Sequence, residues 1–542
     1  MKLRETNIEQ LQKEVFDVLI VGGGINGAVS AAALAARGVR VALIDARDFA
    51  GFTSQHSSNL VWGGIKYLEN FEFSLVAGLC KSRNELLRSF PSTVQEIRFL
   101  TTVQKGFRFH PLMLLAGSWL YWLFGRGQTA MPKYLSSRRI SAEEPLINIS
   151  DSEGGIEYSD AYLHDNDARF VFNFVRSAMD NGCVAANYLE STAAVRVENG
   201  NWRSEVKDQV SGKRFHIEAK VLINAAGAFV DSHNQLAAVE TEYHHLFSKG
   251  IHLIVPQISR SKRVLAFFAN DGRLFFAIPM ANRTCIGTTD TRVDDPYTSV
   301  SDKDRDFVLS NINARLNLTK PLTRADVIAE RCGVRPLAIK KGRDSSTDFL
   351  QLSRKHVVEC NEALSHISIF GGKLTDCLNV GDEICERVAE LGVPLQEVKA
   401  AWYGEPDAAA RAAYYRRAKQ LGIDDSQASD TGEMLSERLW RRYGAQADAI
   451  LDVIEKNPQL CQPLIENTGI RQCELEFLVE REMIVDLHDL LRRRSKIELL
   501  LTPQQLKNSA GLRSACERLF GDRAAQVYRD YFDSSEADRQ SD

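Results

Sequence analysis

With 542 residues, the chain is too long for one hydrophobic core and is expected to form two or three domains of about 100 to 200 residues each. Hydrophobic residues make up 44% and charged residues 25% of the composition, which is ordinary for a soluble globular protein. The formal net charge of -4 excludes a mainly electrostatic nucleic-acid binder, so nucleic acid is not expected among the partners.

The ten cysteines are scattered, with no CxxC pair and no Cys/His cluster at zinc spacing. Neither a disulfide framework nor a metal site is therefore predicted. Residues 1–15 are polar and lack the apolar core of a signal peptide. Both features favour the reducing cytoplasm.

Residues 16–45 have the order of a nucleotide-binding βαβ unit: a short apolar strand, a G-x-G-x-x-G pattern, an alanine-rich helix ending at Gly38, and a second strand over 39–44. Gly22 permits the tight turn, Gly24 lets the backbone approach a pyrophosphate, and Gly27 allows close packing of helix and strand. The helix N-terminus favours phosphate, and Asp45 is placed to accept hydrogen bonds from ribose hydroxyls. The pattern predicts a dinucleotide but does not choose between NAD and FAD.

The segment after Asp45 is rich in hydroxyl groups. Its Thr53, Ser54, Ser57 and Ser58 can hydrogen-bond phosphate and the edge of a flavin ring, which favours FAD over a serine-rich surface loop. The stretch "GGIKYLE" at 63–69 follows. Its Lys66 and Tyr67 are either ordinary solvent-exposed side chains or contacts for an anionic substrate.

The longest apolar run, at 111–125, is shorter than the roughly 18 residues that a transmembrane helix needs. A buried helix and an interfacial helix rich in Trp and Tyr are equal alternatives for it.

The alternation of strands and helices typical of βαβ units ends at about residue 150. An apolar strand precedes Gly227, and apolar runs between 245 and 290, with a turn signal at Asn270–Gly272, predict antiparallel strands that cover a substrate. A strand over 367–370 then leads through Gly371, Gly372 and Lys373 into an amphipathic helix. This arrangement aims a helix N-terminus and Lys373 at the crevice, where they stabilise the negative charge of a flavin being reduced. The alternative is an ordinary turn with a solvated lysine.

From about residue 400 the apolar spacing is helical throughout, which predicts a separate helical domain. Within it, Arg492–Arg494 are expected to be a solvated helix face, with lipid or phosphate contact as the alternative.

The fold class is α/β with an α+β substrate region: a Rossmann-like FAD-binding domain, an antiparallel substrate-binding sheet and a helical C-terminal domain. The FAD-binding domain takes residues 1–90, 151–235 and 351–395. A substrate or cap segment takes 91–150, the substrate sheet 236–350 and the helical domain 396–530. Residues 531–542 are expected to form a disordered tail.

Taken together and in this order, several motifs resemble the FAD-dependent glycerol-3-phosphate dehydrogenases within the D-amino acid oxidase-like flavoproteins. They are "DVLIVGGGINGA", "TSxxSSxLxxGGxxYLE" at 53–69, "LINAAGAFV", "KGIHLIVP", "IGTTD", "CGVRPL", "FGGKLTD" and "EREMIVDLHDLLRRRSK". The resemblance implies FAD as cofactor and oxidation of sn-glycerol 3-phosphate to dihydroxyacetone phosphate, with hydride passing to flavin N5 and electrons to membrane quinone. It also implies a peripheral position on the inner face of the cytoplasmic membrane, and a homodimer is compatible with it.

Carried over by position, the resemblance assigns roles to particular residues. Flavin contacts would be Gly22, Gly24, Gly27, Asp45, Ser54, Ser57, Ser58, Gly227, Gly372 and Lys373. Lys66, Tyr67, Arg335 and Lys373 would bind the substrate phosphate, and a guanidinium such as that of Arg335 grips two phosphate oxygens. His252 would take the proton of the C2 hydroxyl. We therefore predict His252, Arg335 and Lys373 as the catalytic residues.

The chain also departs from the family motif "SSKLIHGGLRYLE", because Asn59, Trp62 and Lys66 replace lysine, histidine and arginine. These changes leave open another small hydroxy acid, amine or amino acid as substrate, and a carboxylate in place of the phosphate. His56 occupies the place at which some amine-oxidising relatives bond the flavin covalently, so it is a further cofactor candidate. A catalytically inactive flavoprotein subunit is the third alternative.

Overall fold

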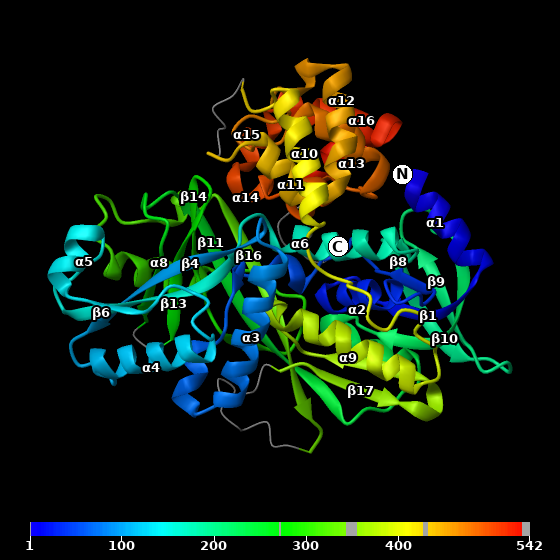
Figure 1. Cartoon of the computed structure of the whole chain (residues 1–542), viewed down its shortest axis with the longest axis horizontal. Coiled ribbons are helices and arrows are strands. Elements are labelled where there is room, and N and C mark those ends of the chain that lie inside the picture. The colour runs from blue at the N-terminus through cyan, green and yellow to red at the C-terminus, as the bar shows by residue number, and fades with distance from the viewer. Residues whose placement is uncertain (1, 270–272, 343–354, 426–431, 534–542) are drawn as a thin grey trace.

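The computed structural model describes residues 2–269, 273–342, 355–425 and 432–533. The predicted turn at Asn270–Gly272 and the predicted tail from 534 onwards lie outside these ranges. Figure 1 shows a sheet with the N-terminal βαβ unit at the right, a second sheet at the left and a helical domain above both. The three-part architecture confirms the predicted fold class.

The first sheet is mainly parallel. Its strands are β1 (Val15–Val21), β2 (Val41–Ile44), β7 (Val184–Ala186), β8 (Leu189–Arg196), β9 (Trp202–Asp208), β10 (Arg214–Asn224), β17 (Val357–Asn361) and β18 (His366–Phe370). The order along the main path is β17-β18-β10-β1-β2-β7, and β1, β2, β7, β10 and β18 pair in parallel. The carboxyl ends of the central strands therefore meet at one edge, where ligands bind in open parallel sheets.

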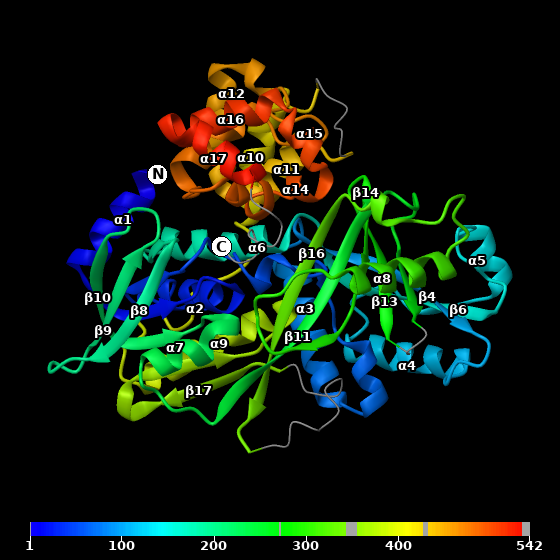
Figure 2. The same ribbon diagram turned by 180° about the vertical axis from the view of Figure 1, so that it is seen from behind.

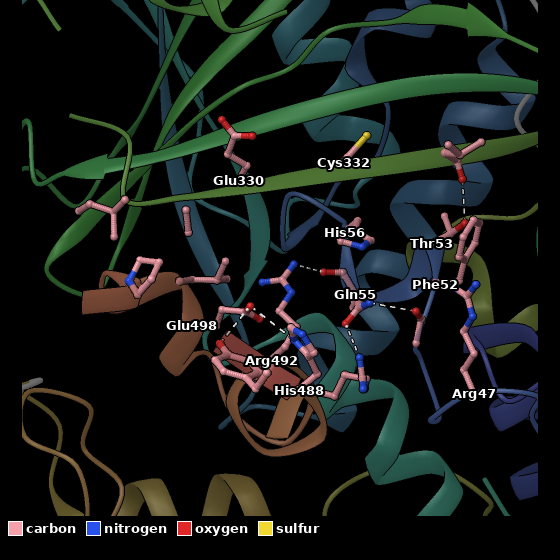
Figure 3. Close-up of a pocket in the computed structure, with 18 of the residues that line it drawn as sticks. Arg47, Phe52, Thr53, Gln55, His56, Glu330, Cys332, His488, Arg492 and Glu498 are labelled. Atoms are coloured by element: carbon pink, nitrogen blue, oxygen red, sulfur yellow. Dashed lines mark hydrogen bonds and ion pairs between the residues drawn. The ribbon is translucent and has the colours of Figure 1, made fainter. Parts of the chain in front are cut away.

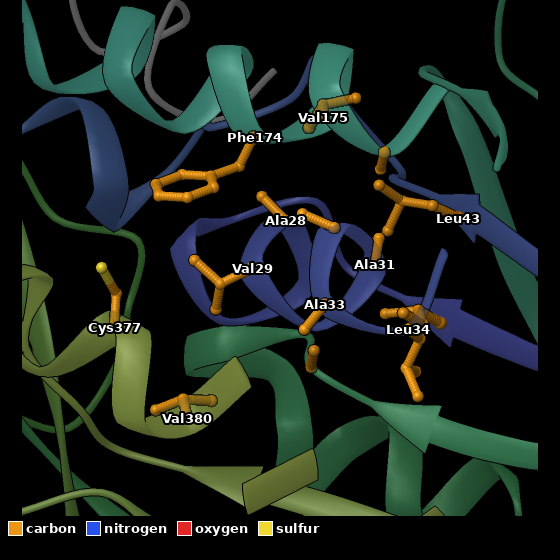
Figure 4. Close-up of a cluster of buried hydrophobic side chains, with 14 of the residues drawn as sticks. Ala28, Val29, Ala31, Ala33, Leu34, Leu43, Phe174, Val175, Cys377 and Val380 are labelled. Carbon is orange, nitrogen blue, oxygen red and sulfur yellow. The ribbon is translucent and has the colours of Figure 1, made fainter. Parts of the chain in front are cut away.

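Small side chains let three helices pack closely on one face of this sheet. They are α2 (Ile25–Ala35), α6 (Asp167–Asp180) and α9 (Cys377–Glu390). Figure 4 shows Ala28 and Val29 of α2 between Phe174 of α6 and Val380 of α9. The alanines allow this helix to sit between two neighbours, which fixes the position of its N-terminus at the edge of the sheet.

The other face of the first sheet carries α1 (Lys2–Lys13) and α7 (Val230–Leu236), and Leu11 of α1 packs against Phe16 and Leu19. Residues Lys2–Lys13 of the polar N-terminal segment form α1, and Arg4 of this helix is buried in an ion pair with Asp208 at 2.5 Å.

The second sheet is large and mixed. Its strands are β3 (Leu60–Val61), β4 (Val94–Gln104), β5 (Lys133–Leu135), β6 (Ser152–Leu163), β11 (Tyr243–Pro256), β12 (Val264–Phe268), β13 (Leu274–Met280), β14 (Arg283–Gly287), β15 (Thr291–Val293) and β16 (Ala329–Lys340). The antiparallel pairing predicted for the runs between 245 and 290 is confirmed for β11, β12, β13 and β14. The sheet continues beyond them through β4, which pairs with β12 in parallel. The predicted boundary at residue 151 is wrong, because β6 pairs with β4 and belongs here and not to the cofactor-side sheet.

Four helices pack around the second sheet. They are α3 (Phe73–Ser89), α4 (Pro111–Phe124), α5 (Ser137–Glu143) and α8 (Asp302–Arg315). α8 packs on the face that carries Ile251 and Leu253, so the opposite face of β11 looks toward the cofactor-side domain. Figure 2 shows β11 and β16 on the side of the second sheet that lies next to the first sheet.

The C-terminal part is helical, as predicted, and no strand follows β18 in the described residues. Its helices are α10 (Ala408–Gln420), α11 (Leu435–Tyr443), α12 (Ala447–Lys456), α13 (Leu475–Arg481), α14 (Ile497–Leu500), α15 (Pro503–Lys507), α16 (Ala510–Phe520) and α17 (Ala524–Asp533). Residues 531–533, predicted as the start of the tail, are the last residues of α17.

The arginines at 492–494 are buried and not a solvated face, which corrects the prediction. Arg494 pairs with Asp48 at 2.6 Å and Arg493 pairs with the same carboxylate at 2.8 Å. Arg492 donates to the carbonyl oxygen of Gln55. These contacts reach across more than four hundred residues and fasten the helical domain to the loop that follows β2.

Candidate functional site

The turn between β1 and α2 has the shape of a dinucleotide cradle. A Cβ added at Gly22 would lie 2.4 Å from the carbonyl oxygen of Ala225, and one at Gly27 would lie 1.8 Å from that of Gly22. Gly22 also has a φ of 105°, which favours glycine. By contrast, Gly24 meets only the Ser54 hydroxyl within 4 Å, so its outer side has room for a ligand. The cradle therefore fits a pyrophosphate.

Polar groups around this turn complete the cradle. α2 begins without a side-chain cap at Gly24, and the Ser54 hydroxyl accepts the amide hydrogen of Ile25 at 3.0 Å. Asp45 accepts from the amides of Gly23 and Arg47. Burial raises the pKa of Asp45 to about 6, despite those hydrogen bonds. The carboxylate thus lies directly after β2, beside the glycine turn.

The second half of the cradle comes from the turns after β10 and β18, at the same carboxyl edge of the sheet. Asn26 donates to the carbonyl oxygen of Gly371 at 3.0 Å, which ties α2 to the turn after β18. Gly371 and Gly372 have φ values of 63° and 106°, and Gly227 has a φ of 59° with open space beside it. The structure brings Gly22, Gly227 and Gly372 to one edge of the sheet.

An ion cluster supports the turn at Gly371–Lys373. His356, just before β17, contacts Asp376 at 2.6 Å and Glu383 at 2.9 Å. Burial alone would lower the pKa of His356, but these two carboxylates outweigh it and raise the pKa to about 9. The imidazole is thus a cation that joins β17 to the start of α9.

The loop from Thr53 to Ser58 runs along the free edge of β16. Thr53 donates to the carbonyl oxygen of Val334 at 2.7 Å. Ser57 donates through both its amide and its hydroxyl to Asp167, each at 2.8 Å. Ser58 is half-buried in the same loop.

His56 is half-buried in this loop, close to Gly333 of β16, whose added Cβ would lie 3.0 Å from the His56 Cβ. Its Nδ1 has no hydrogen-bond partner in the described residues. Burial, Arg492 and Arg331 together hold the pKa of His56 well below its usual value, so the ring is neutral. A neutral ring with an unpartnered nitrogen fits a place beside a cofactor.

A cavity of about 100 Å³ lies beside this loop. Figure 3 shows Arg47, Phe52 and Thr53 on one side of it and Glu498 and His488 of the helical domain on the other. Cys332 and Val334 of β16 line it, together with His56.

The face of β11 and β16 that looks toward the cofactor-side domain carries the predicted catalytic residues. In the antiparallel register, His252 lies opposite Arg331, Gly250 opposite Gly333, and Ser248 opposite Arg335. Because side chains alternate along strands, His252, Arg331 and Arg335 point to the same side.

His252 is buried, and both ring nitrogens lack a hydrogen-bond partner in the described residues. Burial, followed by the charges of Arg331 and Arg335, lowers the pKa of His252 to about 3. The imidazole is neutral at physiological pH and so can accept a proton. An anion bound between the two arginines would raise this pKa toward the working range.

Arg335 is held in a defined place. Its Nη2 donates to the hydroxyl of Thr288 at 3.3 Å, and its Nη1 lies 3.6 Å from an oxygen of Asp290. The guanidinium packs over Gly250, where an added Cβ would lie 2.2 Å from Nη2. Glycine at 250 therefore leaves the space that the guanidinium occupies.

Lys373 and Tyr67, each predicted to bind the substrate, contact each other. The Lys373 Nζ donates to the Tyr67 hydroxyl at 2.9 Å and lies 4.2 Å from the centre of its ring. The Trp62 ring lies 5.9 Å from the Tyr67 ring. Lys66, one residue earlier on the 3₁₀ turn η2 (Ile65–Asn70), is exposed instead. The structure thus brings Tyr67 and Lys373 together but leaves Lys66 at the surface.

Arg331 is a site residue that the sequence analysis missed. It is 1% exposed, and its Nη1 donates to the Ser57 carbonyl oxygen and, at 2.9 Å, to the Asn59 side-chain oxygen. Its Nε and Nη2 have no hydrogen-bond partner in the described residues. Arg331 of β16 thus places a positive charge beside Asn59. In the sequence, the only indication of this role was that Arg331 is a basic residue four positions before Arg335.

The fold and the site define a flavin-dependent oxidoreductase: a dinucleotide cradle at the carboxyl edge of a parallel sheet, covered by a second sheet with a neutral histidine and two arginines. The profile of the family described as "FAD dependent oxidoreductase" matches residues 17–361. The profile described as "C-terminal domain of alpha-glycerophosphate oxidase" matches residues 407–514.

Relatives agree over nearly the whole chain. The glycerol-3-phosphate dehydrogenase of Pseudomonas aeruginosa is 31% identical, with 91% of this chain and 94% of the relative covered. The aerobic glycerol-3-phosphate dehydrogenase of Staphylococcus haemolyticus is 30% identical, with 91% and 88% covered. The chain therefore belongs to the FAD-dependent glycerol-3-phosphate dehydrogenase family.

A solved structure supports the fold. The glycerol-3-phosphate dehydrogenase of Bacillus halodurans, complexed with FAD, superimposes with a TM-score of 0.71 at 24% identity. The superposition covers 100% of this chain and 95% of that one. The helical domain therefore belongs to the shared fold.

Proposed function

We propose that this enzyme oxidises sn-glycerol 3-phosphate to dihydroxyacetone phosphate with bound FAD and passes the electrons on to membrane quinone. The names of the curated relatives support the substrate. One observation carries the proposal: β11 and β16 present a neutral buried histidine and a guanidinium on one face, above the edge that holds the cofactor cradle.

The phosphate of the substrate is bound by Arg335, whose fixed guanidinium can grip two oxygens. Tyr67 and Lys373 complete the anion site, since their side chains already meet. Lys66 lies at the surface on the same turn as Tyr67, where its charge attracts the substrate dianion.

The imidazole of His252 takes the proton from the C2 hydroxyl, because it is neutral and both of its nitrogens are available. FAD, when bound, supplies the acceptor for the two electrons that leave C2. Lys373 and the start of α9 balance the negative charge that then develops.

The cofactor contacts follow from the cradle. We assign them to Gly22, Gly24, Gly27, Asp45, Ser54, His56, Ser57, Ser58, Gly227, Gly372 and Lys373. A test with a readout apart from activity is FAD retention: Gly24→Val should lower the bound flavin per protein, since its side chain would fill the space beside Ser54.

A second candidate is oxidation of another small anionic hydroxy compound, amine or amino acid. The specific observation is the pair Asn59 and Arg331, which replaces the lysine of the family motif by a guanidinium held from another strand. Its unpartnered Nε and Nη2 form an edge that matches a carboxylate as well as a phosphate.

The test is product formation with an artificial electron acceptor. The holoenzyme is given sn-glycerol 3-phosphate, glycerol, a 2-hydroxy acid or an amino acid, and dihydroxyacetone phosphate is measured. Turnover with the first substrate alone supports the proposal, and Arg335→Ala should lower kcat/KM by about 10²-fold or more. Turnover only with a carboxylate substrate would establish the second candidate instead.

A further inference from the structure

Two cysteines of the helical domain, called the thiol pair below, lie side by side in the fold. Cys461 ends the 3₁₀ turn η9 (Pro458–Cys461), which follows α12, and Cys473 lies in η10 (Gln472–Glu474), which leads into α13. η9 and η10 contact each other, and Figure 1 shows α12 and α13 in the helical domain. All ten cysteines belong to the described part of the chain, and none of them is in a disulfide there.

The backbone places the two members of the thiol pair opposite each other. The chain between them turns back on itself, with an antiparallel β-bridge between Pro463 and Arg471. In the same register, the amide of Gln472 donates to the carbonyl oxygen of Gln462 at 3.1 Å. The next pair outward is the thiol pair, in a non-hydrogen-bonded position, where paired Cα atoms lie about 4.5 Å apart. Disulfides join Cα atoms about 4.4 to 6.8 Å apart, so this register suits a disulfide.

The two thiols differ in their access to solvent. Cys473 is completely buried, whereas the exposed fraction of Cys461 is 9%. Gln459 and Gln462, on either side of Cys461 in the chain, are exposed. A small molecule from solvent therefore meets Cys461 before it meets Cys473.

The two thiols also differ in acidity. The Cys473 thiol donates a hydrogen bond to the sulfur of Cys461, which, with the charge of Arg471, lowers the pKa of Cys461 despite burial. The same hydrogen bond and burial raise the pKa of Cys473. Burial raises the pKa of the other eight cysteines too. Cys461 is thus the one cysteine of the ten whose surroundings favour the thiolate, the form that reacts with oxidants.

We propose that Cys461 is a peroxide-reactive thiol that forms a reversible disulfide with Cys473. The Cys461 thiolate attacks one oxygen of a hydroperoxide, so that an S–O bond forms, the O–O bond breaks and the other oxygen leaves with a proton as water or an alcohol. The Cys473 sulfur then attacks the sulfenic acid: the S–S bond forms, the S–O bond breaks, and hydroxide leaves as water with the Cys473 proton. The two thiols lose two electrons and the peroxide gains them.

This pair differs from the disulfide framework that the sequence analysis excluded. In a reducing compartment, disulfides are transient and serve redox sensing, whereas a framework is permanent. A dithiol reductant attacks the S–S bond and returns both thiols of the pair. The reduced pair is therefore the resting form, and the oxidised pair records exposure to peroxide.

The disulfide would join two parts of the helical domain. The turn between the two cysteines contributes Leu464, Ile465 and Ile470 to the core that α16 and α17 share, whereas the thiol pair belongs to the core of α10, α11 and α12. The turn lies tightly against α16, since an added Cβ at Gly511 would lie 1.6 Å from the Leu464 carbonyl oxygen. Closing the disulfide restricts the unfolded chain most at this junction.

The residue after Cys473 belongs to the buried charges that attach the helical domain to α6. Glu474 is completely buried and accepts hydrogen bonds from Arg438 at 2.7 and 2.9 Å. Arg442 lies 3.6 Å from Glu474 and pairs with Asp165, just before α6, at 2.8 Å. Oxidation of the thiol pair should therefore stabilise the helical domain at its attachment to the cofactor-side domain.

The test is peptide mapping of the holoenzyme after treatment with a small excess of hydrogen peroxide and blocking of the remaining thiols with N-ethylmaleimide. Trypsin cleaves after Lys456, Arg471 and Arg481, so the two cysteines fall in separate peptides, 457–471 and 472–481. We expect these peptides to be linked, and dithiothreitol to separate them. The melting temperature of the oxidised holoenzyme should rise by about 5 °C.

Single variants test the two roles. In Cys473→Ser, Cys461 should stop at the sulfenic acid and be trapped by dimedone, whereas in Cys461→Ser no adduct should form on Cys473. Cys360→Ser is the matched control, because Cys360 is more exposed than Cys461 but has a raised pKa. This control should form the linked peptide at the yield of the wild type. In Cys473→Ser, dimedone should label Cys461 about tenfold faster than Cys360.

The wild-type peptide map needs neither a variant nor a substrate, so it tests the pair even if a variant fails to fold. Absence of the linked peptide after peroxide treatment would overturn the proposal. Equal labelling of Cys461 and Cys360 would also overturn it, because the surroundings of Cys461 would then give it no special reactivity. A linked peptide with an unchanged melting temperature would overturn the stabilising effect.

Discussion

Gly250→Ala is the substitution that tests the position of Arg335 with least disturbance to the fold. Gly250 lies in the middle of β11, and its φ lies outside the left-handed region that would strain an alanine. An added Cβ would lie 2.2 Å from Nη2 and 2.5 Å from Cζ of Arg335, whereas ordinary contacts begin at 3.4 Å. The guanidinium must therefore retreat by about 1 Å, which a flexible side chain can do.

A displacement of about 1 Å at a substrate-positioning group costs about 10²-fold in rate. We therefore expect kcat/KM for sn-glycerol 3-phosphate to fall by about 10²-fold in Gly250→Ala, equivalent to about 2.7 kcal/mol. KM should rise, because the phosphate loses one of its ligands before any bond changes. The melting temperature should change little, since the clash is with a side-chain end and not with backbone.

The assay is steady-state kinetics with an artificial acceptor, together with thermal unfolding of the holoenzyme. Gly78→Ala is the matched control, because nothing lies within 4 Å of an added Cβ at that position in α3. Unchanged kcat/KM in Gly250→Ala, with the same melting temperature as the wild type, would refute the placement of Arg335 at the substrate. If Gly250→Ala unfolds, Arg335→Lys also tests whether residue 335 binds the substrate. This substitution keeps the positive charge but loses the planar guanidinium that can bind two phosphate oxygens.

Three further predictions rest on buried charges. Burial and neighbouring charge lower the pKa of His252 to about 3, so the pH profile of kcat/KM should show no loss of activity with a pKa near 6.5. Arg331→Gln removes one of these charges and should shift the loss of activity at low pH to a higher pH. The raised pKa of His356 stabilises the fold fully below pH 6.5, and this contribution disappears as the pH rises through about 9. His356→Gln should thus lower stability by at most about 3 kcal/mol at pH 6.5 and by almost nothing above pH 9, as measured by thermal unfolding. Arg494→Met leaves the buried carboxylate of Asp48 with one arginine fewer and should cost about 3 kcal/mol in urea unfolding; a loss under 1 kcal/mol would contradict this network.

The parts of the site that could be predicted are those whose signal is local in the sequence. Gly22, Gly24, Gly27 and Asp45 stand in one βαβ unit, so spacing alone places them around the same turn. The resemblance to a known family placed His252 and Arg335 in the chain, but not their geometry.

The parts that could not be predicted depend on pairing between distant segments. Arg331 faces His252 because β16 pairs with β11 in one register, and a shift of one residue would point it to the other side. Arg494 is buried because Asp48 lies beside it in the fold. Composition likewise left α4 as a buried or an interfacial helix, and only its packing through Tyr121 shows which side faces out.

The most direct measurement of the central claim is the visible spectrum of the purified holoenzyme, without oxygen, before and after addition of sn-glycerol 3-phosphate. If Arg335 and His252 position this substrate at the flavin, the oxidised absorption near about 450 nm should disappear rapidly in the wild type and slowly or not at all in Arg335→Ala. A flavin that stays oxidised with sn-glycerol 3-phosphate, but is reduced by a hydroxy acid or an amine, would contradict the assigned substrate.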